Sequence, residues 1–269
     1  MLKETLEMKN TTDKLAFAQK ENYTLEDIFT LVRILRSPEG CAWDRAQTHA
    51  SVRKNLIEET YEVADGIDRD DAPALLEELG DFLFEGAFHI VMEEERGRFD
   101  VQDVATALCR KMIARHPHVF SQTSDGQAPD WEAAKKKEKG QTTLEAALDD
   151  IPRALPALMY AKKISARAAA VGFTYESADE GREKVCEEWR ELAEAPDATA
   201  QKEELGDLLF ALVNYARLLG IDAEEALDLA SQKVRMRLVE MEKNVAKNSK
   251  ILSECTKTEL LAAWDAIKK

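Results

Sequence analysis

The sequence predicts an all-α protein built from two tandem copies of one helical unit. Its 269 residues include only 11 Gly and 7 Pro, with 33% charged and 45% hydrophobic residues. Such a composition is rich in helix formers and poor in turn residues. Apolar residues also recur at helical spacing in several segments. Finally, a series of acidic, basic and aromatic residues in the first half returns in the second, which indicates a duplicated supersecondary unit.

The first half is expected to contain a helical hairpin. We assign residues 1–20 to an N-terminal extension, and Thr24 is a suitable cap for the helix that follows it. A second helix is predicted over 51–68, where apolar residues form a stripe, and a third begins near Pro73 after a short turn. A further helix opens at Asp100. Because short links join antiparallel neighbours, the second and third helices should pack side by side.

The segment 40–49, between the first two predicted helices, is unusually aromatic and polar for a connector. Two interpretations of it remain open. Trp43 could fill space inside the helix bundle, or the loop could cover a ligand pocket, since loops on a rigid scaffold often carry binding groups.

Carboxylates repeat on the predicted hairpin. Glu59 and Glu62 border the apolar stripe of one helix, while Glu78 and Asp81 share a flank of the next. Antiparallel packing would therefore bring four carboxylates together across a groove. Equivalent positions in the second half hold Glu188, Glu191, Glu204 and Asp207.

The repeat extends beyond the acids. Its offset is 129 residues at Glu58 and Glu187 (187 minus 58) and 126 at Glu78 and Glu204 (204 minus 78), so the intervening turns differ by three residues. A Lys-x-x-x-Arg pair and a Trp-x-x-x-Lys pair follow in each half. These are Lys111 with Arg115 and Trp131 with Lys135, then Lys233 with Arg237 and Trp264 with Lys268.

From this repeat we predict a first unit over 21–139, a connector over 140–172 and a second unit over 173–269.

Clustered carboxylates without Cys or His in register form a hard-oxygen site, which suits Mg²⁺, with Mn²⁺ as a substitute. The plainer interpretation is a solvated helical face. The acids border apolar stripes, however, and buried carboxylates without a cation are costly. A di-iron site would need Glu-x-x-His motifs, which the acidic positions lack. We interpret His89 as a packed polar residue, because Tyr215 stands at the matching position.

Bound Mg²⁺ commonly bridges carboxylates to phosphates, so a polyphosphate is the expected substrate. The two Lys/Arg pairs could neutralise its outer phosphates, and the two Trp/Lys pairs could close over a nucleotide. Taken alone, each Lys/Arg pair is as consistent with a surface ion pair.

Charge and composition exclude several functions. A net charge of −15 and a pI near 4.9 argue against binding a nucleic-acid polymer, whose phosphates require basic surface. Four widely separated cysteines suggest neither a zinc site nor a disulfide framework. No apolar run approaches the length of a membrane span or resembles a signal peptide, so we expect no membrane association and a cytoplasmic location.

Together these motifs resemble those of the MazG-type nucleoside triphosphate pyrophosphohydrolases, which belong to the all-α NTP pyrophosphatase group. The resemblance runs from about residue 24 to residue 269, in the two-repeat form of that family. It is most specific at Gly40-Cys41-x-Trp43-Asp44 with Gln47-Thr48, at both acidic motifs, at Arg115-His116-Pro117-His118-Val119-Phe120 and at Leu148-Asp149-Asp150-Ile151-Pro152. Ala42 departs from the proline usual in that loop.

The resemblance implies an enzyme that hydrolyses nucleoside triphosphates between the α and β phosphates, giving a monophosphate and pyrophosphate, with water as the nucleophile. It implies that both sets of acids hold Mg²⁺ and that Glu58 and Glu187 orient or deprotonate water. It also implies bundle cores of the four-helix type that are completed by formation of a homodimer. The biological role would be to cleanse or control the nucleotide pool.

Two alternatives remain: a helical interaction module without catalysis, and a more substrate-restricted relative such as a dUTPase-like enzyme. Both copies keep the acids, the Lys/Arg pair and the Trp/Lys pair. We expect the second copy to be the active one, because Asn214 offers an amide suited to reading a nucleobase where the first copy has Phe88.

Overall fold

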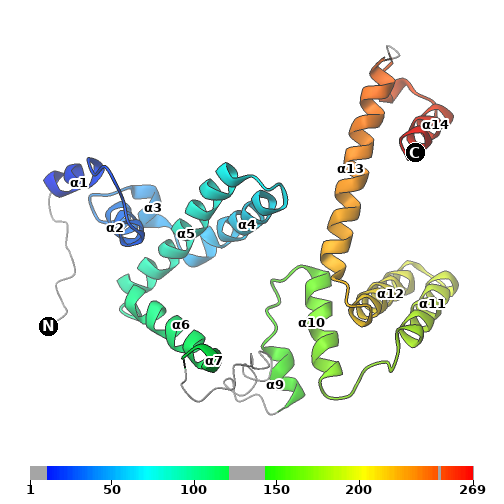
Figure 1. Cartoon of the computed structure of the whole chain (residues 1–269), viewed down its shortest axis with the longest axis horizontal. Helices are drawn as coiled ribbons and strands as arrows, with labels where there is room; N and C mark the ends of the chain where they lie inside the picture. Colours follow the sequence, from blue (N-terminus) through cyan, green and yellow to red (C-terminus); the bar gives the residue numbers. More distant parts are fainter. Residues whose placement is uncertain (1–10, 121–142, 248–249, 269) are drawn as a thin grey trace. The chain divides into compact units, whose positions relative to one another are not determined.

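The computed structural model describes residues 11–120, 143–247 and 250–268 of the chain. Every regular element in these ranges is helical, which confirms the all-α prediction (Figure 1). Two compact units are formed by residues 1–134 and 135–269. Trp131 and Lys135 lie outside the described residues.

The first unit is organised around an antiparallel hairpin of two long helices, α4 and α5, and α2 packs against α5 (Figure 1). Buried side chains from these three helices form its core, which includes Val32, Val52, Phe88 and Met92. The helices of this unit are α1 Thr11–Ala18, α2 Leu25–Arg36, α3 Ala42–Ala46, α4 His49–Asp68, α5 Ala72–Glu95, α6 Val101–Arg115 and α7 Pro117–Phe120.

Capping residues explain where these helices begin. Thr24 and Asp27 form the predicted capping box of α2, and Asp100 and Asp103 form one for α6. The side chain of Asp71 accepts a hydrogen bond from the Ala74 amide at the start of α5, whose first turn also contains proline. The predicted hairpin therefore follows from local sequence signals together with an apolar face.

The segment 40–49 differs from the expectation of a plain loop, because it contains the short helix α3. Arg36, which is 8% exposed, donates hydrogen bonds to the carbonyl oxygens of Asp44 and Gln47 and forms an ion pair with Glu95. Trp43 is 62% exposed, so it does not fill the bundle. The interpretation of Trp43 as a core residue is therefore wrong.

Two stacked histidine rings join the first turn of α4 to α5. The ring centres of His49 and His89 are 4.9 Å apart, and their Nδ1 atoms are 2.6 Å apart. His49 Nε2 also lies 2.5 Å from the buried carboxylate of Glu93, which pairs with Arg96 and Arg98. His89 is thus a packed polar residue whose Nε2 is buried without a hydrogen-bonding partner among the described groups.

The second unit repeats the arrangement. Its hairpin consists of α11 and α12, and α10 packs against α12 as α2 packs against α5 (Figure 1). Ser177 and Asp197 cap the two hairpin helices. Helix α13 then extends to α14 near the C-terminus. The elements are α9 Leu144–Asp149, α10 Ala157–Ala169, α11 Ala178–Glu194, α12 Ala198–Leu218, α13 Ala223–Lys247, the 3₁₀ helix η1 Leu252–Glu254 and α14 Lys257–Ile267.

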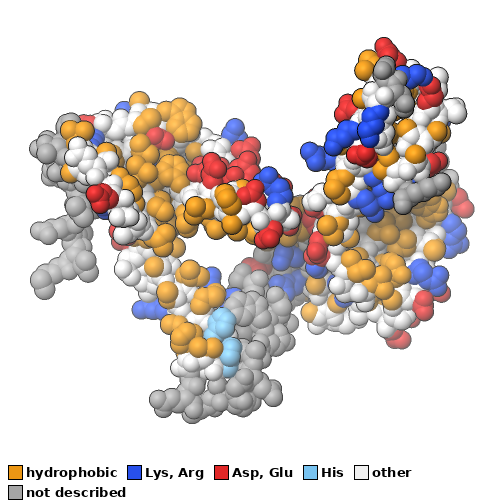
Figure 2. Space-filling model, turned by 45° about the horizontal axis from the view of Figure 1, so that its top comes forward, with side chains coloured by type: hydrophobic (Ala, Val, Ile, Leu, Met, Phe, Trp, Pro, Cys, Tyr) orange, Lys and Arg blue, Asp and Glu red, His pale blue; other side chains and the backbone are white. Residues whose placement is uncertain are grey.

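Both hairpins leave apolar side chains exposed. Leu79, Phe82 and Leu83 on α5 are each about two-fifths exposed, and Leu205 and Leu209 on α12 are similar. Figure 2 shows hydrophobic surface beside a group of acidic side chains on the first unit. Among the helices described, none combines the length and apolar character needed to cross a bilayer.

Candidate metal centre

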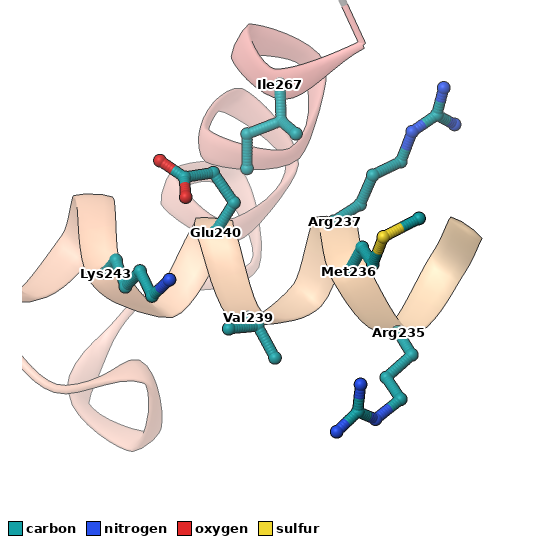
Figure 3. A pocket seen from close by; sticks show the side chains of 7 residues that line it. All are labelled: Arg235, Met236, Arg237, Val239, Glu240, Lys243 and Ile267. Atoms are coloured by element: carbon teal, nitrogen blue, oxygen red, sulfur yellow. The ribbon is translucent and has the colours of Figure 1, made fainter. Parts of the chain in front are cut away.

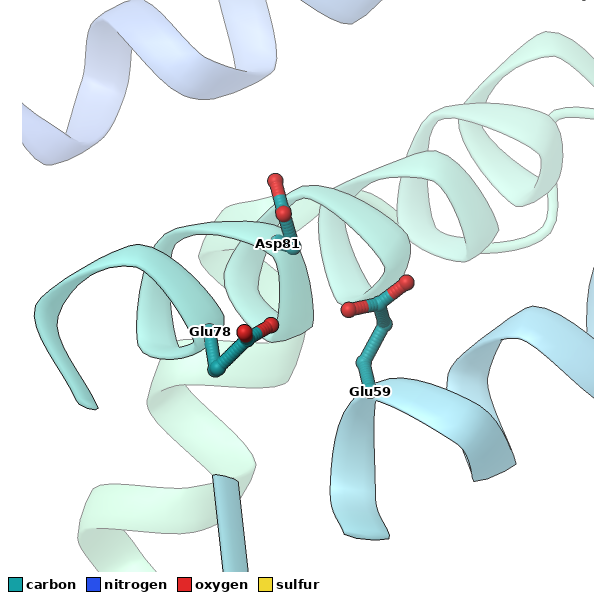
Figure 4. A group of neighbouring side chains, drawn as sticks. All are labelled: Glu59, Glu78 and Asp81. Carbon is teal, nitrogen blue, oxygen red and sulfur yellow. The ribbon is translucent and has the colours of Figure 1, made fainter. Parts of the chain in front are cut away.

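Three acids of the first hairpin converge. Glu59 on α4 and Glu78 and Asp81 on α5 each offer a carboxylate oxygen, and these oxygens lie within 4.8 Å of one another. Figure 4 shows Glu59 reaching from its helix towards the α5 side chains. Glu59 and Glu78 are half-buried, whereas Asp81 is exposed. The antiparallel hairpin thus brings carboxylates separated in sequence into one group.

Burial and mutual repulsion raise the pKa values of two of these acids, Glu59 and Glu78. Burial, followed by the charges of Glu62 and Asp81, raises the pKa of Glu59 to about 6. Burial and the charges of Glu62 and Glu77 likewise raise the pKa of Glu78. Glu62 therefore acts on both converging glutamates, although it is not one of the three acids whose oxygens lie together. A divalent cation would relieve this repulsion, so the donor set fits a hard metal ion.

The second hairpin forms a similar group from Glu188, Glu191 and Glu204, again within 4.8 Å. Glu188 is 6% exposed. Burial, followed by the nearby carboxylate of Glu188, raises the pKa of Glu191. Asp207 is exposed one turn beyond Glu204 on α12 and is not one of the three.

The sequence interpretation missed a cation in this second group. Lys184 Nζ lies 2.8 Å from Glu187 Oε1 and 2.7 Å from Glu188 Oε1. These contacts raise the pKa of Lys184, and its ammonium lowers the pKa of Glu187. Lysine at positions i−3 and i−4 from paired glutamates was the available signal, because such side chains meet on a helix.

The first copy has no lysine at the corresponding position. Adding the offset of 129 residues to Asn55 gives Lys184, and the neutral side chain of Asn55 acts on Glu85, whose pKa it lowers. Glu85 is 8% exposed, and burial raises its pKa. Its counterpart in α12 is Ala211.

The predicted Lys/Arg pair of the first unit lies on the helix that follows the acidic hairpin. Lys111 is exposed and Arg115 is buried on α6, which begins beyond the C-terminal end of α5. The step of 14 positions from Asp81 to Glu95 (95 minus 81) alone spans roughly 21 Å of helix.

Lys233 is exposed and Arg237 is half-buried on α13, which begins beyond the C-terminal end of α12. Lys and Arg side chains follow this helix in Figure 2. Arg237 and Ile267 help to line a depression of about 480 Å³ between α13 and α14, shown in Figure 3.

Asn214 and the second Trp/Lys pair also have partners of their own. Asn214 Oδ1 accepts hydrogen bonds from Ser165 Oγ at 2.6 Å and from Arg217 at 2.9 Å. The ammonium of Lys268 lies 5.7 Å from the ring centre of Trp264 and also pairs with Asp265.

Comparison with known proteins agrees with the duplicated geometry. The MazG nucleotide pyrophosphohydrolase domain matches residues 47–120 and again residues 176–240. The chain is 42% identical over 255 residues to "Nucleoside triphosphate pyrophosphohydrolase" of Escherichia coli, covering 91% of this chain and 97% of that protein.

A Thermotoga maritima protein named "Nucleoside triphosphate pyrophosphohydrolase/pyrophosphatase MazG" is 40% identical over 243 residues, covering 90% and 95% of the two chains. With two matched domains, two acidic hairpins and relatives aligned over nearly their full length, this chain belongs to the MazG nucleotide pyrophosphohydrolase family.

Proposed function

We propose that the protein hydrolyses nucleoside triphosphates between the α and β phosphates and so cleanses or controls the nucleotide pool. One water is consumed, its oxygen joins phosphorus, and the α–β anhydride bond breaks to leave a monophosphate and pyrophosphate. The observation that carries this proposal is the convergence of carboxylates on each hairpin of a MazG-family chain.

The carboxylates are proposed to hold Mg²⁺, or Mn²⁺ in its place. Glu59, Glu62, Glu78 and Asp81 would serve the first site, and Glu188, Glu191, Glu204 and Asp207 the second. When bound, the cation polarises the phosphoryl group, activates water and neutralises charge on the departing pyrophosphate. The raised pKa values of Glu59, Glu78 and Glu191 support this assignment, because they reflect negative charge that is poorly balanced without a cation.

Glu58 and Glu187 are proposed to orient water and accept its proton. Glu187 is held by Lys184, which lowers the pKa of its carboxyl and keeps it ionised near neutral pH. An ionised carboxylate can accept a hydrogen bond from water, and this directs the oxygen lone pair towards an electrophile. Glu58 is exposed on α4 at the matching position.

The basic and aromatic residues are proposed to contact the nucleotide. The two Lys/Arg pairs on α6 and α13 would neutralise phosphates that the metal does not reach. The Trp/Lys pairs would cover the nucleoside, and Asn214 would read the base.

A homodimer is proposed to cover the exposed apolar side chains of the hairpins. Contiguous apolar surface of this kind typically marks a protein interface. Two apposed hairpins would complete a four-helix core. Light scattering coupled to size-exclusion chromatography tests this, and a mass of 30.2 kDa at micromolar concentration would contradict it.

Product analysis is the decisive experiment for the activity. The purified chain is incubated with Mg²⁺ and a panel of standard, deaminated and deoxy nucleoside triphosphates, and the products are separated by ion exchange. We expect monophosphate and pyrophosphate in equal amounts, and no product in EDTA. Diphosphate plus phosphate would contradict the proposed cleavage position.

The same panel separates the two alternatives. Turnover of dUTP alone would indicate the substrate-restricted enzyme. Absence of turnover with every substrate would favour a helical interaction module.

A further inference from the structure

One structurally equivalent position beside the two acidic groups holds a neutral side chain in the first unit and a charged one in the second. The caps Thr48 and Ser177 begin the acidic helices α4 and α11, and they lie 129 residues apart, as do Glu59 and Glu188. Asn55 and Lys184 therefore occupy the same place, one turn before the first glutamate of each group. The two groups have equivalent glutamates, but the first has a neutral amide where the second has an ammonium.

In the second group an ammonium of the chain itself contacts one of the converging acids. Lys184 Nζ is 2.7 Å from a carboxylate oxygen of Glu188, which is one of the three converging acids. Glu188 is 6% exposed, so this ion pair is only weakly screened by water. A metal ion that uses Glu188 must displace the ammonium or bind beside it.

In the first group the corresponding side chain, Asn55, is neutral, and it lowers the pKa of Glu85 against the larger effect of burial. The charge of Arg69 lowers the pKa of Glu78, and Arg69 also has its own ion pair with Asp65 at 2.9 Å. The negative charge of the first group is thus left for an external cation to balance.

We propose that Lys184 is a positioning residue that weakens divalent-cation binding at the second site while fixing Glu187, so that the first site, with Asn55, binds the cation more tightly. This inference rests on the proposed metal-dependent function. A unit charge a few ångströms from a divalent ion repels it strongly in a partly buried site. Groups adjacent to metal ligands typically change metal affinity 10- to 100-fold. We therefore expect the affinities of the two sites to differ by about tenfold or more.

The test is direct measurement of Mn²⁺ binding to the full-length chain without nucleotide, by the EPR signal of free Mn²⁺. The second site is isolated by Glu59→Gln with Glu78→Gln, and the first by Glu188→Gln with Glu204→Gln. In these backgrounds Asn55→Lys and Lys184→Asn exchange the two side chains. We expect Lys184→Asn to tighten the second site about tenfold and Asn55→Lys to weaken the first by a similar factor.

Two further variants separate charge from shape. Lys184→Met keeps the length of the side chain and should tighten Mn²⁺ binding as Lys184→Asn does, whereas Lys184→Arg should leave it weak. Circular dichroism of each variant confirms that it is folded. Equal affinities at the two sites, unaffected by the exchange, would overturn the inference but leave the proposed metal dependence intact. Failure of either site to bind Mn²⁺, even in Lys184→Asn, would overturn both.

Discussion

The two units share an acidic hairpin but differ in how they balance its charge and how they attach a third helix. In the first, the acids repel one another, and α2 is held by apolar packing around Val32, which is fully buried, together with ion pairs from Arg33 and Arg36 to the end of α5. In the second, Lys184 pairs with two glutamates, and α10 is held in part by buried Ser165, which hydrogen-bonds Asn214 and Arg217. A duplicated unit can therefore keep its backbone layout while single side chains change its electrostatics.

The largest expected effect concerns which hairpin performs catalysis. Glu191→Gln removes a carboxylate from the second group, and we expect hydrolysis to fall about 100-fold or more, the scale of losing one stabilising group in an active site. Glu62→Gln makes the same change in the first group and should keep most of the activity. Pyrophosphate release at saturating Mg²⁺ measures both.

Saturating metal is needed in this comparison, so that a change in affinity is not mistaken for a change in turnover. Complete loss in Glu62→Gln with activity retained in Glu191→Gln would reverse the assignment. Similar losses in both variants would indicate that the two hairpins cooperate.

The next comparison concerns the attached helices. Val32→Ala removes two buried methyl groups and leaves a cavity, so the first unit should lose about 2 kcal/mol of unfolding free energy. Ser165→Ala removes a hydroxyl that is 4% exposed and that both donates and accepts a hydrogen bond, which should cost the second unit about 1 kcal/mol. Urea unfolding of each variant measures these losses.

The smaller cost of Ser165→Ala has a structural reason. In Ser165→Ala, Arg217 would still donate hydrogen bonds to Asn214 Oδ1 at 2.9 Å and to Thr174 Oγ1 at 2.8 Å. Arg217 and Asn214 would therefore each keep a hydrogen-bonding partner. A loss larger than that of Val32→Ala would show that the polar network, and not apolar burial, dominates the attachment of α10.

Much of this fold could be read from the sequence, because its signals are local. Thr24, Asp100 and Ser177 begin helices where expected, since a cap needs only its own first turn. The convergence of Glu59 with Glu78 follows from a short turn between amphipathic helices. The spacing of Lys184 from Glu187 and Glu188 permits both ion pairs, but whether they form, and with how deeply buried a carboxylate, depends on rotamers and burial.

The sequence was less informative at Trp43, whose apolar character suggested a core position. In the structure Trp43 is exposed, and the segment around it is held by hydrogen bonds from Arg36 to the carbonyl oxygens of Asp44 and Gln47. Contacts of this kind between a side chain and the backbone leave no periodic signal in the sequence.

The stacked histidines provide a pH-dependent contrast between the units. Burial and the charge of His49 lower the pKa of His89 in the folded state. The unfolded chain therefore binds a proton at this residue more readily. The stability that the neutral ring contributes is complete above the unfolded pKa of about 6.5 and is lost as pH falls below it. The two Nδ1 atoms of His49 and His89 are 2.6 Å apart, so one of them donates a hydrogen bond to the other. Protonation of the acceptor nitrogen would replace this hydrogen bond with two N–H groups that face each other.

Replacing His89 with tyrosine, the residue that α12 has in Tyr215, should remove this dependence. We expect the midpoint temperature of the first unit to fall between pH 7 and pH 5.5 in the parent chain, and to fall less in His89→Tyr. Other charged groups near the pair titrate or respond to pH in both chains: Glu93 pairs with His49 and with Arg96 and Arg98, Glu85 lies one turn before His89 on α5, and Arg33 and Arg36 of α2 pair with the end of α5. The difference between the two variants therefore isolates the contribution of His89. Identical pH profiles would contradict the role of the pair.

The smallest expected effect sharpens the contrast between the two acidic groups. Because the folded pKa of Glu59 is about 6, above the ordinary 4.5, the folded state binds a proton more readily here. Ionised Glu59 thus destabilises the metal-free first unit above pH 6, and the penalty disappears below pH 4.5. Glu59→Gln should raise the midpoint temperature in EDTA at pH 7.5 but not at pH 4.5, and should reduce the further rise caused by Mg²⁺.

Glu58→Gln removes the same charge from an exposed neighbour outside the group and is the matched control. The first unit's transition is identified as the one that Val32→Ala shifts. If Glu59→Gln lowered that midpoint at pH 7.5, repulsion would not be the dominant interaction of this carboxylate, and the first group would be balanced internally as the second is by Lys184.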